Sequence, residues 1–178
     1  MKIFEISERP DLLPYAIEYF WGCWGNETNF KFYEDCIKHS LSKEKPIPKF
    51  YILLQDNNII GSYALLTNDI ISRQDLMPWF ACLHVNEEKR NNGIGKMLIE
   101  HGLREAAEKG FPMLYLSTDL EGFYEKKGWS FFADGYGVRG GYNKIYSKQT
   151  LMWNCGDCRL YIIHFSFVFT DPRSLLLL

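Results

Sequence analysis

The sequence has no long uninterrupted hydrophobic run and no excess of charge of either sign. Its longest apolar tract, 160–169, is interrupted by His164 and Ser166 and is too short to span a bilayer, which takes about 20 residues. The first residues lack the continuous apolar segment of a signal peptide. The 20 basic and 22 acidic residues nearly balance, so the charge indicates neither nucleic acid nor an anionic membrane as a partner. We therefore expect a cytoplasmic protein.

The chain also lacks the cysteine pattern of a secreted disulfide framework. Its five cysteines are an odd number at scattered positions, which favours a reduced setting. Cys155 and Cys158 have the spacing of half a metal or redox site. A zinc site needs a second pair of ligands, and no such pair is visible at a suitable spacing. We therefore expect no metal.

The sequence does contain enough apolar material for one core, with 178 residues of which 47% are hydrophobic. Alternation predicts strands, and spacings of three or four residues predict amphipathic helices. The predicted order is a strand at 2–6, helices at 10–24 and 29–41, a hairpin of 50–54 and 59–66, a strand at 79–85, a helix at 93–109, a strand at 113–117, a short helix at 120–127, and a hairpin of 129–136 and 142–147. This order predicts a mixed α+β domain with one strand–helix–strand crossover.

Turn residues mark several of these boundaries. The first hairpin turns at 56–58, where Asp and Asn tolerate positive φ. Gly110 is expected to end the helix that begins at Gly93, and Gly128 to end the short helix.

The junction of the strand at 79–85 with the following helix is the most informative segment. Gly93 and Gly95 open the helix after a charged loop. The first turn of a helix has free N–H groups and a partial positive charge, so it can hold a phosphate, and glycine lets the anion approach. A Walker A loop would need Ser or Thr where Met97 stands. A dinucleotide fingerprint would need a small residue where Leu98 stands.

Two motifs resemble the GNAT acetyltransferase superfamily. Arg90-x-x-Gly93-x-Gly95, placed after Leu83-x-Val85, resembles the acyl-CoA signature of that family. Downstream, the segment 123–129 (Phe-Tyr-Glu-Lys-Lys-Gly-Trp) is similar to a later family motif. The two motifs and the elements between them cover about 79–132, and the looser order of elements extends the resemblance to 2–148. The resemblance implies a GNAT-like α+β fold, with a mixed, mostly antiparallel central sheet flanked by helices, over residues 1–150.

The resemblance also implies acetyl-CoA as the co-substrate. Its pyrophosphate would bind the backbone N–H groups of the loop and helix start, namely Asn91, Asn92, Gly93, Ile94, Gly95 and Lys96. Arg90 would shape this loop or reach a phosphate. Leu83 and Val85 would pair with the pantetheine arm as a neighbouring strand would. The strand at 79–85 would splay from the strand at 113–117 and admit the thioester.

The implied reaction is direct acetyl transfer to an amine. A strand N–H near Leu83 would stabilise the developing oxyanion, and Tyr124 would act as the general acid that protonates the departing CoA thiolate. The alternative for Tyr124 is an aromatic that only packs against the helix. The rival function is a non-catalytic acyl-CoA-binding regulatory domain, and the presence of Tyr124 favours the enzyme.

The base is less well marked. Strict alternation places Phe80, Cys82 and His84 on one face of the strand and the residues between them on the other. His84 titrates near neutrality and is the candidate base, while the alternative is a histidine satisfied on the sheet surface. Cys82 is expected to be a small buried residue. Glu27 and Asp69 are further candidates that no motif supports.

The family resemblance places the acceptor between the first two helices and the final hairpin. Aromatic and acidic groups there suit a small cationic amine, and a protein N-terminus or lysine is the alternative. The candidates are Trp21, Trp24, Glu27, Phe30, Asp134, Tyr136 and Tyr142, of which Trp21 and Phe30 are expected in the core. Residues 151–178 form a C-terminal extension that exceeds the family fold. Its β-rich stretch is expected either to add an edge strand or to contact a second copy in a homodimer.

Overall fold

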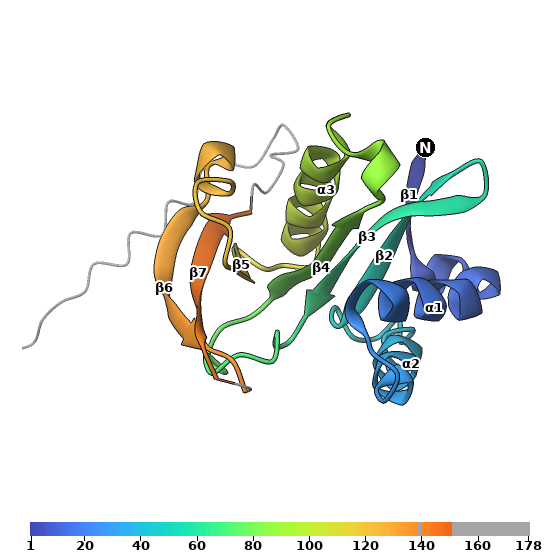
Figure 1. Ribbon diagram of the computed structural model, residues 1–178, viewed down its shortest axis with the longest axis horizontal. Coiled ribbons are helices and arrows are strands. Elements are labelled where there is room, and N and C mark those ends of the chain that lie inside the picture. The colour runs from blue at the N-terminus through green and yellow to red at the C-terminus, as the bar shows by residue number, and fades with distance from the viewer. Residues whose placement is uncertain (139, 151–178) are drawn as a thin grey trace, which may run out of the picture.

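The computed structural model describes residues 1–138 and 140–150 (Figure 1). The predictions for Cys155, Cys158 and the β-rich extension lie outside these residues. The described helices and strands are β1 (Lys2–Glu5), α1 (Leu13–Trp24), α2 (Phe30–His39), β2 (Lys49–Gln55), β3 (Asn58–Leu66), β4 (Trp79–Val85), α3 (Ile94–Glu108), β5 (Met113–Thr118), β6 (Ser130–Tyr136) and β7 (Tyr142–Gln149). Short 3₁₀ turns occupy Ile6–Glu8, Pro10–Leu12, Glu87–Lys89 and Glu125–Lys127.

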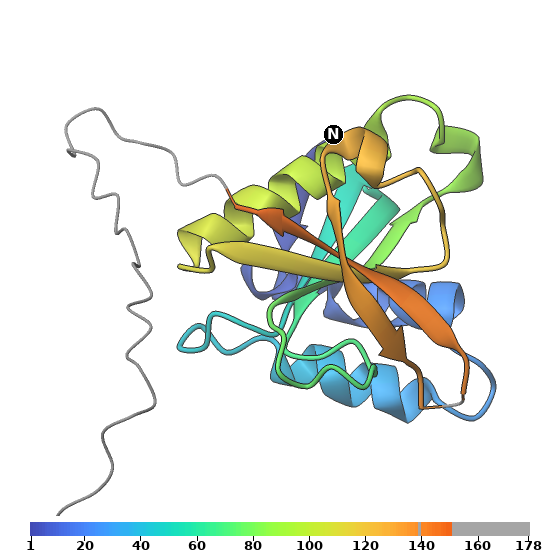
Figure 2. The same cartoon turned by 90° about the vertical axis from the view of Figure 1, so that its left-hand side faces the viewer.

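The strands form one mixed sheet in the order β1-β2-β3-β4-β5-β7-β6. All neighbouring pairs are antiparallel except β4 and β5, which are parallel and joined through α3. These two parallel strands pair only at Trp79 and Tyr115 and then separate. The mostly antiparallel sheet and the splay between its two central strands are therefore confirmed. Figure 2 shows the twist between the β6–β7 hairpin and the strands β2–β4.

Helices cover both faces of the sheet, with α3 on one face and α1 and α2 on the other (Figure 1). The α3 face buries Tyr63, Phe80 and Leu98 in one cluster. The opposite face buries Phe20 of α1 and Ile37 of α2 in a second cluster. Each helix thus contributes an apolar stripe to a core on its own side of the sheet.

Turn chemistry explains where the elements end. Asp56 (φ 51°) and Asn57 (φ 62°) both adopt left-handed backbone between β2 and β3, as a two-residue hairpin turn requires, which confirms the predicted turn. Gly110 follows α3 with φ 84°, a conformation that glycine reaches without a Cβ clash.

The predicted helix at 120–127 is wrong. Only the 3₁₀ turn at Glu125–Lys127 forms there. Gly122 has φ 71°, which cannot continue a right-handed helix, and the backbone N–H of Leu120 donates to the Thr118 side chain instead. The predicted end at Gly128 (φ 76°) is confirmed.

A search of the described residues for membrane spans found no helix with the length and apolar character to cross a bilayer.

Two helical glycines differ in how tightly they are packed, and this difference is testable. A Cβ at Gly102 of α3 would lie 2.5 Å from the buried Phe80 ring, whereas a Cβ at Gly22 of α1 would meet nothing within 4 Å. We expect Gly102→Ala to lower the free energy of unfolding by about 1–3 kcal/mol through overpacking. Gly22→Ala should raise it by about 0.5–1 kcal/mol because alanine favours helix. Urea denaturation of both variants measures this, and equal effects would contradict the packing described.

Candidate active site

A β-bulge in β4 shapes the centre of the site. Ser62 pairs with His84 and Ala64 pairs with Ala81, so two residues of β4, Cys82 and Leu83, lie opposite Tyr63 alone. Cys82 takes the unusual φ of 53°, and the Ser62 hydroxyl donates a hydrogen bond to its carbonyl oxygen at 3.1 Å. The strand bends here, next to the gap that opens between β4 and β5.

The bulge also corrects the predicted faces of β4. Phe80 packs in the α3 cluster with Leu83 and Val85, while Cys82 packs in the opposite cluster beneath α1 and α2. The prediction that Phe80 and Cys82 share a face was therefore wrong. Strict alternation fails because the extra residue of the bulge shifts the pattern by one.

The loop after β4 leaves a row of backbone donors free. Asn91 (φ 62°) and Gly93 (φ 76°) have left-handed backbone, and the first helical hydrogen bond runs from the Met97 N–H to the Gly93 carbonyl. Within residues 1–138 and 140–150, the backbone N–H groups of positions 91–96 donate no hydrogen bond. Six unpartnered donors therefore lie just before and at the start of a 15-residue helix, whose dipole favours an anion there.

Side chains of the loop hold its own backbone in place. The Arg90 Nε donates to the Val85 carbonyl at 3.0 Å, and its guanidinium pairs with Glu87 at 3.4 Å. The Asn92 amide donates to the carbonyls of Lys89 and Arg90. Arg90 thus holds the loop backbone in this structure, and its role toward a phosphate stays a prediction.

Open space lies above Gly93 and Gly95. A Cβ added at either position would meet no protein atom within 4 Å. Packing therefore does not require glycine at position 95, and a group outside the protein chain has room to approach the backbone there. This room and the free N–H row fit the pyrophosphate of coenzyme A.

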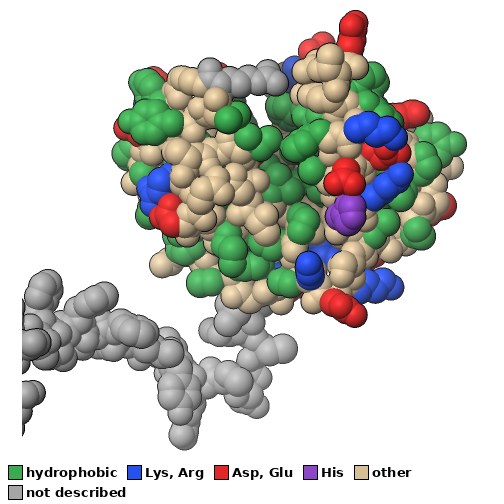
Figure 3. Space-filling view, turned by 90° about the horizontal axis from the view of Figure 1, so that it is seen from below, with side chains coloured by type: hydrophobic (Ala, Val, Ile, Leu, Met, Phe, Trp, Pro, Cys, Tyr) green, Lys and Arg blue, Asp and Glu red, His purple; other side chains and the backbone are tan. Residues whose placement is uncertain are grey.

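A cavity of about 840 Å³ opens beside the splayed strands. Its walls come from α2, the loop between β3 and β4, the bulged part of β4, the end of β5, and Tyr124. Figure 3 shows that the molecule is hollowed on its lower side, with hydrophobic side chains around the depression. The volume suits a small-molecule ligand.

Tyr124 lines this cavity just before the 3₁₀ turn at Glu125–Lys127. Its carbonyl accepts hydrogen bonds from the N–H groups of Lys127 and Trp129, and its ring packs edge-on against Phe123 and Trp129. The side chain is buried, with 7% exposure, and burial raises the pKa of Tyr124 to about 12. No described residue is hydrogen-bonded to its hydroxyl. The phenol is therefore protonated at neutral pH and free to donate into the cavity.

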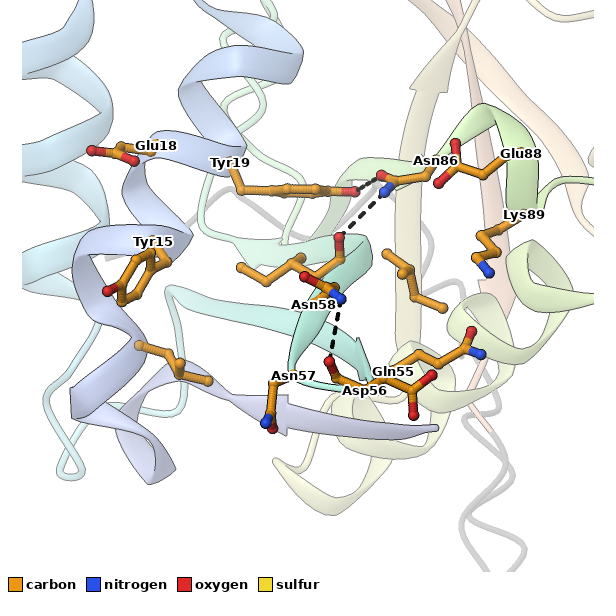
Figure 4. Close-up of a pocket in the computed structure, with 13 residues that line it drawn as sticks. Tyr15, Glu18, Tyr19, Gln55, Asp56, Asn57, Asn58, Asn86, Glu88 and Lys89 are labelled. Carbon is orange, nitrogen blue, oxygen red and sulfur yellow. Dashed lines mark hydrogen bonds between the residues drawn. The ribbon is translucent and has the colours of Figure 1, made fainter.

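His84 lies on the side of α1 and does not line this cavity. The Tyr19 hydroxyl donates to the Asn86 Oδ1 at 2.6 Å (Figure 4), so its oxygen accepts the Nδ1–H of His84 at 2.9 Å. Burial, helped by the charge of Arg90, lowers the pKa of His84. Tyr19 and Asn86 border a second, open hollow between α1 and the β2–β3 turn.

Asp69 lies in the β3–β4 loop and lines the cavity that holds Tyr124. Burial raises the pKa of its carboxyl to about 7. The described lining also holds the carboxylates of Asp35 and Asp119 and the imidazole of His39, and it includes no lysine or arginine. The cavity thus has an acidic field that favours a cation.

The predicted acceptor residues divide into two groups. Trp24 lines the cavity, whereas Trp21 donates its indole N–H to the Asn26 carbonyl and packs against Phe30, as expected of a structural pair. The remaining candidates, Glu27, Asp134, Tyr136 and Tyr142, are exposed and do not line the cavity. The sequence analysis missed the α2 wall formed by Phe32, Tyr33, Cys36 and His39. Their spacing places them along one side of α2, which is the signal that could have found them.

Comparison with known proteins gives the family. The chain matches the family model described as acetyltransferase (GNAT) family over residues 13–129. It therefore belongs to the GNAT acetyltransferase family, as the two motifs predicted. A search of curated proteins found no significant match.

Solved structures share this fold. An aminoglycoside 6'-acetyltransferase type Ii aligns with a TM-score of 0.66 and 20% identity over 85% of this chain and 99% of that chain. An aminoglycoside 6'-N-acetyltransferase complexed with coenzyme A aligns with a TM-score of 0.64 and 16% identity over 85% of this chain and 98% of that chain. A GNAT-family acetyltransferase from Desulfovibrio desulfuricans aligns with a TM-score of 0.62 and 15% identity over 84% of this chain and 99% of that chain. At these identities the likeness concerns the fold.

The raised pKa of Asp69 predicts a pH-dependent stability. An unfolded aspartate titrates near about 3.9, so between there and about 7 the folded chain binds more protons and loses stability as pH rises. Asp69→Asn removes this loss. We expect its melting temperature relative to wild type to increase from pH of about 4 to about 8, measured by differential scanning calorimetry. A difference that is constant with pH would show that the carboxyl titrates normally.

Proposed function

We propose that this chain is an acetyl-CoA-dependent N-acetyltransferase that acts on a small cationic amine, with the activity in residues 1–150. The observation that carries the proposal is the unpartnered Tyr124 hydroxyl, which belongs to the cavity beside the separated strands β4 and β5. The row of free N–H groups at 91–96 follows β4 in the chain. A thioester donor needs an anion site for its pyrophosphate, an open strand edge for its pantetheine arm and a proton donor for its sulfur, and these three features supply them.

The donor half of the site is formed by β4 and α3. The N–H groups of 91–96 would bind the pyrophosphate, and the room at Gly95 fits it. The stretch of β4 from Leu83 to Val85 no longer pairs with β5, so its backbone is available to the amides of the pantetheine arm. When bound, acetyl-CoA supplies an activated acetyl group. The bulged backbone near Leu83 would stabilise the negative charge that develops on the thioester oxygen.

Tyr124 would protonate the departing sulfur. Its raised pKa keeps the phenol in the donor form at neutral pH. An alkyl thiol titrates near about 8.5, so full transfer from this phenol is uphill unless the phenolate is reprotonated at once. The acylated nitrogen carries an acidic proton at that stage and can return it to Tyr124 directly or through water. The proton that the acylated nitrogen loses thus replaces the one that Tyr124 gives to the sulfur.

The acceptor half is the acidic and aromatic part of the cavity. Aspartates without neighbouring lysine or arginine attract a cation, and Trp24, Phe32 and Tyr33 offer aromatic surface to an ammonium group. His84 is the base proposed from the sequence, and its ring is held by Tyr19 outside the cavity lining.

Substitution of Gly95 tests the donor site. Gly95→Asp places a negative charge at a helix start, which stabilises the helix by about 0.3–1 kcal/mol but repels a phosphate. We expect the free protein to keep its melting temperature while its stabilisation by acetyl-CoA and CoA is lost. Wild type at 100 times Kd should gain about 2.7 kcal/mol. Gly95→Ala is the control and should retain binding, and NAD should stabilise neither protein.

Absence of any shift of wild type with either CoA species would contradict the donor assignment. A shift without thiol release from any amine would instead identify a non-catalytic acyl-CoA-binding domain.

Substitution of Tyr124 tests the acid. Tyr124→Phe should lower kcat by about 100-fold or more, because general acid catalysis is typically that large, with CoA binding unchanged. Thiol release measured with 5,5'-dithiobis(2-nitrobenzoate) and a panel of primary amines gives the rate. Tyr146→Phe is the matched control, since that neighbouring phenol donates to Glu125 at 2.5 Å and does not line the cavity. Equal turnover by Tyr124→Phe and wild type at neutral pH would remove the acid role.

A further inference from the structure

Asp69 is the carboxylate on the described cavity lining that is both partly buried and unpartnered. No hydrogen bond or ion pair to its side chain exists among residues 1–138 and 140–150. The two other lining aspartates are exposed, and Asp35 lies 3.3 Å from the His39 ring nitrogen. Partial burial of a carboxylate without a partner costs stability, so its presence in a ligand-sized cavity points to a partner that arrives with the ligand.

The described cavity lining provides no lysine or arginine to pair with the Asp69 carboxylate. The titratable side chains that face this cavity are Asp35, His39 and Cys36 of α2, Tyr33 beside them, Cys82 of β4, Asp119 after β5, and Tyr124. Burial raises the pKa of both thiols, so Cys36 and Cys82 are neutral near pH 7. Lysine and arginine are absent from the described lining. A cationic ligand is therefore the group that can neutralise the Asp69 carboxylate.

We infer that Asp69 binds the ammonium group of the acceptor and accepts its proton. This inference rests on the proposed function. In the first step an N–H bond of the ammonium breaks and an O–H bond forms on Asp69, which leaves the neutral amine with a lone pair. That lone pair forms the C–N bond as the C–S bond breaks, and the sulfur takes its proton from Tyr124. The acylated nitrogen returns a proton to Tyr124, and Asp69 releases its proton to water.

The positions of the two residues favour Asp69 over His84 as the base. Asp69 and Tyr124 line one cavity, so an amine held at Asp69 can reach a thioester placed between β4 and β5 without leaving it. The His84 ring instead donates to Tyr19 on the side of α1 and is not part of that lining. A base must lie within hydrogen-bond reach of the proton it removes, either directly or through one water.

The test compares Asp69→Asn, His84→Ala and wild type in thiol release from acetyl-CoA. The amines are 2-phenylethylamine, tyramine, spermidine and kanamycin. Asp75→Asn is the matched control, because Asp75 lies in the same β3–β4 connection, pairs with Arg73 and does not line the cavity. We expect Asp69→Asn to lower kcat/KM by about 100-fold at neutral pH. Stabilisation by acetyl-CoA should stay at the wild-type level, which shows that the fold and the donor site are intact.

The pH profile distinguishes a base from a residue that only supports the fold. As pH approaches the pKa of the acceptor amine, more amine is already neutral, so the deficit of Asp69→Asn should shrink. A structural defect would give a deficit that does not change with pH. Such a constant deficit, wild-type turnover by Asp69→Asn, or a pH-dependent deficit in His84→Ala alone would each overturn the inference. No thiol release by wild type with any of the amines would overturn the proposed function as well.

Discussion

The separation of β4 from β5 is the constraint on which the rest of the site depends. Two parallel strands in the middle of a sheet would ordinarily continue to pair, but here pairing stops after Trp79 and Tyr115. Backbone groups of β4 beyond that point face a gap instead of a neighbouring strand. An interior strand edge of this kind offers hydrogen bonds to an extended ligand, and the cavity begins where the strands part.

Residues on both sides of the sheet pack around the point where the two strands separate. At the closed end, Trp79 is fully buried, contacts Tyr115, and donates its indole N–H to the Leu76 carbonyl at 2.6 Å. On the α3 face, Gly102 lets the helix approach the Phe80 ring closely. On the opposite face, the Cys82 bulge turns the strand toward α1 and α2. The helix start at Gly93 and the cavity thus lie along one strand, as the proposed meeting of donor and acceptor requires.

The sequence predicted those parts of the molecule that local chemistry dictates. Asp56 and Asn57 indicated a turn because few residues tolerate positive φ, and Gly93 indicated the start of a helix, which begins at Ile94. The anion site at this helix start stays a prediction. The bulge at Cys82 escaped prediction because no glycine or proline marks it and only pairing with β3 reveals it. Asp69 carried no motif, and the residues that line the cavity with it come from separate elements, among them α2, β4 and β5.

Coenzyme A is proposed to lie along β4 with its pyrophosphate on the helix start at 91–96. Backbone amide chemical shifts in ¹⁵N-labelled protein measure this directly. Titration with CoA should shift the amide signals of 91–96 and of Leu83–Val85, whereas pantetheine, which lacks the pyrophosphate, should shift only the β4 signals. Amide signals at 91–96 that stay unchanged with CoA, or that respond equally to pantetheine, would show that the pyrophosphate does not bind this helix start.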